Sequence, residues 1–259
     1  MKTIIPTIIT IFILCSCSNQ NMTKYSHQYE SQLANITSRG YDLYNYDVSC
    51  WLASDTLVTY HPDNERLGQF LAKDNDSVWT VYFGKSSQDQ NSFIIAYEIS
   101  LSKMMKILSV KEYKEGKRDS SWLMRASKAI TLTKLDFGKQ NLTYNYYVFP
   151  DTSQNILVYY IPAKTNNKET PLGGDVRYIV SKDGSNILRI TRLHKSVIMM
   201  PQPVEGAMAG MHSHIIIKTP VETDVFFVLS QRPRLPHYIF SDNGMYIVKS
   251  DGEILLENK

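Results

Sequence analysis

The sequence predicts an α+β fold that is mostly antiparallel sheet with a few helices. Short apolar runs rich in β-branched and aromatic residues recur along the chain, and clusters of Gly, Asp, Asn and Ser separate them. Other segments place their apolar residues at helical spacing. Strands joined by such short turns pair as antiparallel neighbours. The 259 residues suffice for one large domain or two small ones.

The N-terminal residues have the layout of a secretory signal peptide. Lys2 precedes an apolar run of 11 residues from Ile4 to Leu14, and a polar stretch begins at Ser18. A membrane-spanning helix needs roughly 20 apolar residues, so this run is too short to span. We therefore expect residues 1–16 to be a signal peptide that is removed during export.

The residues before Cys17 resemble a bacterial lipobox. Leu14 stands three places before this cysteine and the small residue Ser16 directly before it, whereas Cys15 follows the bulky Leu14. The resemblance implies that Cys17 begins the mature chain and carries acyl chains such as palmitate, which anchor the protein to the cell envelope. Because Ser18 and not Asp follows the cysteine, we expect the outer membrane in a host with two membranes. The alternative is an ordinary signal peptide with a chance cysteine.

A polar segment and a helix are expected next. Residues 17–24 would form a short lipidated tether. Residues 25–40 should be helical, with Gly40 at the end. The apolar residues at helical spacing in this segment are Tyr25, Tyr29, Leu33 and Ile36.

Strands are expected in the following part of the chain. The apolar runs lie at residues 50–59, 78–83, 93–101 and 107–113. Cys50, in the first run, is the lone cysteine once Cys15 is removed and Cys17 is acylated. A lone cysteine forms no internal disulfide, and the apolar neighbours of Cys50 indicate a buried side chain.

A second helix and more strands follow. Asp119-Ser120-Ser121 can cap a helix over residues 122–135, and Gly138 can end it. Turn sequences predict two hairpins, and a further strand follows an Asn-Gly turn. The expected strands are residues 144–149 with 156–161, residues 176–181 with 187–193, and residues 245–249.

A polar loop at residues 163–171 is the candidate boundary between two halves. It divides the chain into an N-terminal α+β region, residues 25–165, and a C-terminal β-rich region, residues 166–259. The 28 basic and 25 acidic residues nearly balance and form no like-charge block. Nucleic acid is therefore not expected as a partner, which leaves the membrane, a protein or a small molecule.

A pair of histidines marks the candidate site. His212 and His214 are two residues apart on a strand expected over residues 211–217, so both side chains should point to the same face. Asp224 follows in the first turns of an expected helix. Two imidazoles and one carboxylate suit a three-ligand zinc site with one position open to water.

The helix that carries Asp224 has its own start signal. Thr219 is a suitable N-cap, Pro220 suits the first helical position, and Glu222 completes a capping box. The chain must therefore reverse just before Thr219, which would turn the helix N-terminus back toward the histidines.

This stretch resembles the JAMM (MPN) metalloisopeptidase motif, in which a strand His-x-His precedes a helix-opening Ser-x-x-Asp. The residues that match by type are His212, His214 and Asp224. The resemblance implies a zinc-dependent hydrolase. The gap to the aspartate is one residue shorter than in the family, and Ile215 and Val221 replace the usual Pro and Ser. The family's upstream catalytic glutamate has only Glu169 as a candidate.

The longer stretch from residue 172 to the Asp251-Gly252 turn is similar to an uncharacterised family of exported bacterial proteins. This resemblance implies a domain and no particular activity.

The residues of the candidate zinc site also have a purely structural interpretation, because a helix dipole favours Asp224 near the helix N-terminus and histidines are common at sheet edges. His194 and His237 are isolated in the sequence and receive no role.

Three functions are therefore open. The leading hypothesis is a membrane-anchored envelope lipoprotein that binds or scaffolds without catalysis. The second is a zinc-dependent hydrolase that uses His212, His214 and Asp224. The third is a small-ligand carrier with a cleft between the two halves.

Overall fold

The computed structural model describes residues 16–257, so the expected signal peptide lies outside the described residues except for Ser16. Within this range, three α-helices and fourteen strands form an α+β fold with mostly antiparallel sheets. The predicted fold class is confirmed. Lipid attachment at Cys17 stays a prediction.

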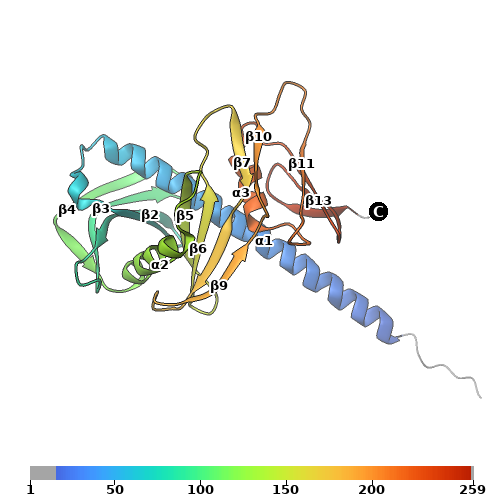
Figure 1. Cartoon of the computed structure of the whole chain (residues 1–259), viewed down its shortest axis with the longest axis horizontal. Coiled ribbons are helices and arrows are strands. Elements are labelled where there is room, and N and C mark those ends of the chain that lie inside the picture. Colours follow the sequence, from blue (N-terminus) through green and yellow to red (C-terminus); the bar gives the residue numbers. More distant parts are fainter. Residues whose placement is uncertain (1–15, 258–259) are drawn as a thin grey trace, which may run out of the picture.

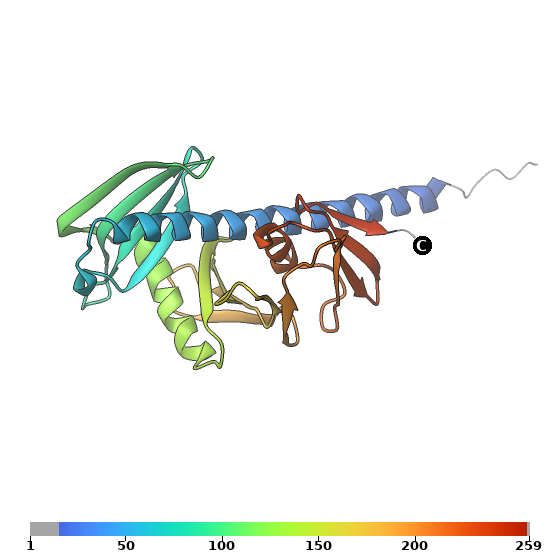
Figure 2. The ribbon, with the colours of Figure 1, turned by 90° about the horizontal axis from the view of Figure 1, so that it is seen from above.

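The longest element is a single helix, α1 (Ser16–Val58), which runs along the whole molecule (Figures 1 and 2). Residues 17–24, which were expected to form a tether, belong to this helix. Residues 50–58 belong to it as well, so the prediction of a strand at residues 50–59 is wrong. The buried apolar residues of α1 from residue 43 onward are Leu43, Tyr46, Cys50, Ala53 and Leu57. They repeat every three or four positions, which is the spacing of one helix face.

Gly40 does not end the helix, contrary to the prediction, because it lies where α1 meets the short helix α3 (Glu222–Ser230). A Cβ atom built on Gly40 would lie 2.4 Å from the Cβ of Val225. Only glycine therefore allows the two helices to approach this closely at residue 40.

The first sheet follows a 3₁₀ turn at Asn64–Arg66 and has the strand order β1-β2-β3-β4. Its strands are β1 (Gln69–Asp74), β2 (Val78–Ser86), β3 (Phe93–Ser102) and β4 (Ile107–Asp119). Three of them were predicted and β1 was not. The helix α2 (Trp122–Phe137) comes next, as predicted, and the Asp119 carboxylate accepts the backbone N–H of Leu123 at 3.0 Å.

The second sheet has the order β5-β6-β8-β9 and contains both predicted hairpins. Its strands are β5 (Tyr144–Pro150), β6 (Ile156–Pro162), β8 (Val176–Val180) and β9 (Ile187–Arg192). Strands from both sides of the loop at residues 163–171 therefore share one sheet. A separate ribbon pairs β7 (Glu169–Gly173) with β10 (Val197–Pro201).

The third sheet closes the C-terminal end in the order β11-β12-β13-β14. Its strands are β11 (Gly210–Ser213), β12 (His237–Ser241), β13 (Gly244–Val248) and β14 (Ile254–Glu257). The strands β11 and β12 run parallel, with α3 as the connection between them. This strand–helix–strand unit lies beside α1 and carries most of the candidate site (Figure 1).

Two apolar cores hold these layers together. The large one joins α1, α2 and the first two sheets, and the smaller one joins α1, α3 and the third sheet. The smaller core includes Leu33, Leu229, Ile239 and Tyr246. No helix within residues 16–257 is long and apolar enough to cross a membrane.

Candidate metal centre

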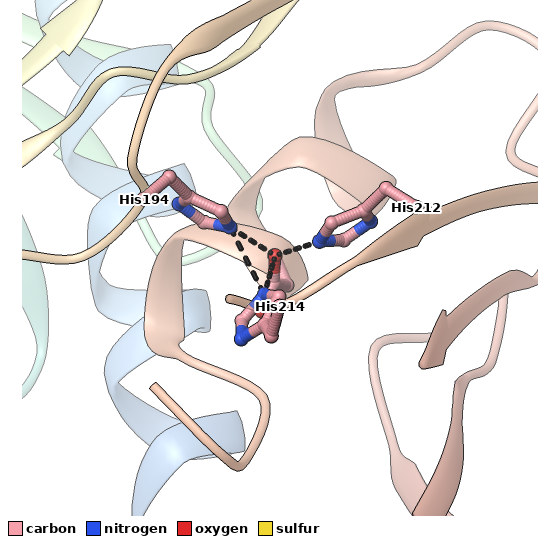
Figure 3. A group of neighbouring side chains, drawn as sticks. His194, His212 and His214 are labelled. Atoms are coloured by element: carbon pink, nitrogen blue, oxygen red, sulfur yellow. Dashed lines mark hydrogen bonds and ion pairs between the residues drawn. The ribbon is translucent and has the colours of Figure 1, made fainter. Parts of the chain in front are cut away.

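Three histidines and one aspartate converge at the junction of α3, β11 and the β9–β10 connection. They are His194, His212, His214 and Asp224. Each offers one ligand atom, and these four atoms lie within 4.8 Å of one another. All four side chains are buried, and the three imidazoles point toward the Asp224 carboxylate (Figure 3).

The sequence-predicted pair comes from the end of a short strand. His212 lies on β11, which ends at Ser213 and not at residue 217 as predicted. The backbone of His214 still follows the sheet, because its N–H donates to the carbonyl oxygen of Phe240 at 2.8 Å. The two imidazoles therefore stay on the same side, as alternation along a strand requires.

Asp224 is fixed by the start of α3, which differs from the prediction. The helix begins at Glu222 with Val221 as its N-cap, so the expected start at Thr219 is wrong. The Oδ2 atom of Asp224 accepts the backbone N–H of Val221 at 2.7 Å. Its Oδ1 atom lies 3.0 Å from His194 Nε2 and 3.2 Å from His212 Nε2.

Glu222 has a different role from the predicted cap. Its carboxylate is buried and accepts hydrogen bonds from the hydroxyl of Tyr159, at 2.8 Å, and from the guanidinium of Arg177. It therefore ties the first turn of α3 to β6 and β8. Because Asp224 is two residues further on, this contact also sets the position of the site carboxylate.

His194 is the fourth member of the cluster, and the sequence analysis missed it. It follows β9, and its Nε2 atom lies 3.0 Å from His214 Nε2. Its Nδ1 atom donates to Asp175 Oδ1 at 2.7 Å. Gly173 packs against it with a φ of +80°, and a Cβ there would lie 2.9 Å from the Cβ of His194. Nothing in the local sequence marks this histidine.

A further histidine, His237, orients His212 by a hydrogen bond on the side of the ring that faces away from Asp224. The Nδ1 atom of His212 and the Nε2 atom of His237 are 2.9 Å apart. Burial, with a smaller contribution from His212, lowers the pKa of His237 to about 4, so His237 is neutral and accepts this hydrogen bond. The Nε2 atom of His212 is therefore left facing the centre of the cluster. It is buried and makes no hydrogen bond.

The charges in the cluster stabilise each other. Burial alone would lower the pKa of His194, but the charge of Asp224 and the hydrogen bonds to Asp175 and Asp224 raise it to about 10. Burial alone would raise the pKa of Asp224, but the positive charge and the hydrogen bond of His194, with smaller contributions from the contacts with His212 and His214, hold it well below its usual range. A cation at this centre would take over the role of the His194 proton.

Three of the distances between the candidate ligand atoms are close to those around a tetrahedral ion. Zinc bonds to histidine nitrogen and carboxylate oxygen of about 2.0–2.1 Å place tetrahedral ligand atoms about 3.3 Å apart. The distances from the ligand atoms of the three histidines to Asp224 Oδ1 are 3.0, 3.2 and 3.4 Å. The unpartnered Nε2 atom of His212 gives the same indication, because a buried polar atom is rarely left without a partner.

The remaining predicted residues lie elsewhere. Glu169 is exposed at the start of β7, about 13 Å of strand from Gly173, which contacts His194. It is not brought into the cluster. Cys50 is a free, buried cysteine, and burial raises the pKa of its thiol well above the usual value. Its predicted burial is confirmed.

No protein-family model, no curated protein and no solved structure matches this chain. The chemistry of the site therefore has to be inferred from its own residues. Three neutral imidazoles and one carboxylate suit a divalent transition metal, and four protein ligands leave no open tetrahedral position.

Proposed function

We propose that this chain is a lipid-anchored protein of the cell envelope whose C-terminal part is organised around one structural zinc ion. The observation that carries the metal proposal is the convergence of His194, His212, His214 and Asp224, all buried, from three separate segments. A catalytic zinc site keeps one position for water, whereas a structural site is closed by protein ligands. The closed set favours a non-catalytic role.

A zinc ion would stabilise the part of the fold that has the smaller core. The metal would tie the connection after β9, which carries His194, to β11 and to α3. The apolar cluster between α1, α3 and the third sheet is small, and small cores stabilise a fold weakly. Structural zinc sites contribute folding energy directly, so this is where a metal has the largest effect.

The anchor proposal rests on the sequence around Cys17 and agrees with the course of α1. The N-terminal end of this helix projects beyond the third sheet (Figure 2). Acyl chains on Cys17 would therefore place the third sheet and the metal centre nearer to the membrane than β1–β4. The helix would act as a stiff spacer of about 1.5 Å per residue.

The metal content of the purified chain tests the proposal. The mature chain from residue 17 with Cys17→Ser should contain one zinc per chain by elemental analysis. The double variant His212→Ala/His214→Ala should contain none. The matched control is His61→Ala, because His61 is exposed and outside the cluster. If the wild-type chain takes up no zinc, or if the double variant takes up as much, the proposal is wrong.

A zinc-dependent hydrolase is the second candidate, and one observation favours it. A hollow of about 60 Å³ is lined by His194, His212 and His214 among others. A water needs about 10–15 Å³ of such space, so a fifth, water ligand has room beside the metal. Zinc-bound water is a nucleophile at neutral pH.

The coordination number separates the two candidates. Cobalt(II) substituted for zinc absorbs strongly in the visible when it has four tetrahedral ligands and weakly when it has five or more. We expect the strong four-coordinate spectrum. A five-coordinate spectrum, together with metal-dependent cleavage of peptide or isopeptide substrates, would instead support the hydrolase.

A further inference from the structure

A second candidate site lies beside the junction of α1 and α3. It is a cavity of about 400 Å³ between these helices, β5 and β7, within the size range of small-molecule sites. The helix α1 contributes Asp47, Trp51 and Ser54, and α3 contributes Thr223 and Phe226. None of these residues belongs to the metal-binding cluster.

Aromatic side chains form much of the cavity wall. They include Trp51, Phe70, Tyr146, Tyr147, Phe226 and Phe227. Several are held in place by their neighbours: the rings of Tyr147 and Phe226 meet edge to face, and those of Phe70 and Tyr146 are stacked. The faces of such rings carry partial negative charge and attract cations.

The polar groups of the cavity are incompletely paired. The Asp47 carboxylate accepts a hydrogen bond from the Tyr147 hydroxyl at 2.8 Å, and it forms no ion pair within residues 16–257. Burial raises the pKa of Asp47, as expected for a carboxylate without a cation. The hydroxyl of Thr223 is buried and has no hydrogen-bond partner. Both groups line the cavity.

One carboxylate of the lining is without a cation. Asp47 and Asp175 both line the cavity, but Asp175 uses its Oδ1 atom to hold His194, so Asp47 is the carboxylate left for a ligand. Lys164 is the opposing charge, but it is exposed and forms no ion pair in the part of the chain that the structure describes. The cavity therefore presents carboxylate and ring faces, which suit a positively charged ligand.

We infer that this cavity binds a small organic cation, an ammonium compound whose apolar body lies against the aromatic wall and whose charge meets Asp47. The ammonium group would supply the missing partner of the Asp47 carboxylate. The Thr223 hydroxyl would bind a polar group at the far end of the ligand. This site would make the protein a carrier or receptor for the cation at the membrane surface, independently of whether the metal centre holds zinc.

A comparison of three probes of similar size and different charge tests the inference. The mature Cys17→Ser chain is titrated with 2-phenylethylammonium, 2-phenylethanol and 3-phenylpropionate by calorimetry and by tryptophan fluorescence. Trp51 is 63% exposed, so its emission can report a bound ligand. The cation should bind at least about tenfold more tightly than the neutral and anionic probes, the usual value of a hydrogen bond to a charged group.

Two matched variants locate the site. Asp47→Asn keeps an acceptor for Tyr147 but removes the charge, and it should weaken binding of the cation about tenfold or more. Asp55→Asn removes the same charge from an exposed position on the same helix and should change nothing. Unchanged melting temperatures would show that both variants are folded.

The inference fails under any of three results. Equal or tighter binding of the neutral or anionic probe would assign the site to another chemistry, with Lys164 as the candidate partner of an anion. No saturable binding of the cation up to about 10 mM, weaker than any specific small-molecule site, would leave a water-filled cavity. Equal effects of the two variants would place the cation elsewhere. If Asp47→Asn does not fold, the comparison of the three probes with the mature Cys17→Ser chain still tests whether the site prefers a cation.

Discussion

The Nδ1 atom of His194 donates a hydrogen bond to Oδ1 of Asp175 at 2.7 Å, and this contact turns the Nε2 atom of the same ring toward His214 and Asp224 in the candidate metal centre. The two residues meet because β8 and β9 pair with Val176 opposite Arg192. Just beyond this pair, the N–H of Leu193 donates to the carbonyl oxygen of Asp175. A carboxylate behind a ligand histidine fixes its orientation and raises its basicity.

Replacing Asp175 should therefore weaken metal binding without abolishing it. We expect Asp175→Asn to lower zinc affinity about 10- to 100-fold, the usual effect of losing a partner behind a ligand. Competition with a chromophoric chelator measures this change. The control is Asp183→Asn in the exposed turn between β8 and β9, which should leave the affinity unchanged. Equal affinities of the two variants would show that Asp175 does not support the site.

Removal of the metal should destabilise the C-terminal part of the fold selectively. Zinc at 100 times its dissociation constant adds about 3 kcal/mol of stability, equivalent to about 5–10 °C in melting temperature for a chain of this size. Hydrogen exchange of the chelated protein should accelerate in β11, in β12 and around His194. The sheet β1–β4 is an internal control, because it packs in the other core. Uniform acceleration over the whole chain would contradict a local role for the metal.

Local periodicity predicted most of the fold. The strands β2–β6, β8, β9 and β13 and the helix α2 were found because each is a short apolar or amphipathic run between clear turn residues. The α1 segment after Gly40 was misassigned for a physical reason. Glycine usually ends a helix, but at position 40 it serves the close approach to Val225, a contact 185 residues away in the sequence that no local pattern reveals.

The candidate site was predicted in part for the same reason. His212, His214 and Asp224 lie in one short segment, where strand alternation and a helix start bring them together. His194 joins them only through the register of the β8–β9 hairpin and its packing on Gly173. That information is tertiary, so the sequence analysis expected an open three-ligand site where the structure brings four candidate ligands together.

Cys50 should be unreactive in the folded protein. Burial raises the pKa of its thiol well above the usual value, so the reactive thiolate is scarce in the native protein. In the mature Cys17→Ser chain, Cys50 is the lone thiol, and a thiol-reactive chromophore should label it only after denaturation. The melting temperature should be the same with and without reductant. Rapid labelling of the native protein, or a lower melting temperature on reduction, would contradict this prediction.

The anchor prediction can be tested with two neighbouring cysteines. Cys17→Ser in the full-length chain should release the protein from the membrane fraction or leave it as an unprocessed precursor, because no thiol is left for acylation. Cys15→Ser is the matched control and should leave processing and membrane retention intact, since it lies in the expected signal peptide. Membrane fractionation and the mass of the mature N-terminus give the answer. Unchanged retention of the Cys17→Ser variant would show that another feature holds the protein.

Zinc binding should release at least one proton near neutral pH. In the metal-free protein both ring nitrogens of His194 face carboxylates, Asp175 and Asp224, and its pKa of about 10 keeps it protonated at pH 7. A histidine ligand must be neutral, so the metal has to displace this proton. The apparent affinity should therefore rise about tenfold per pH unit between pH 6 and 8.

The metal-free protein provides the reference for this measurement. His194 has a raised pKa, so its contribution to stability is present at low pH and is lost only as the pH rises through about 10. Asp224 has a depressed pKa, so its contribution is lost only at acid pH. Neither changes between pH 6 and 8. Calorimetry in buffers of different ionisation enthalpy counts the protons released. A count of zero would mean that His194 is already neutral before the metal binds.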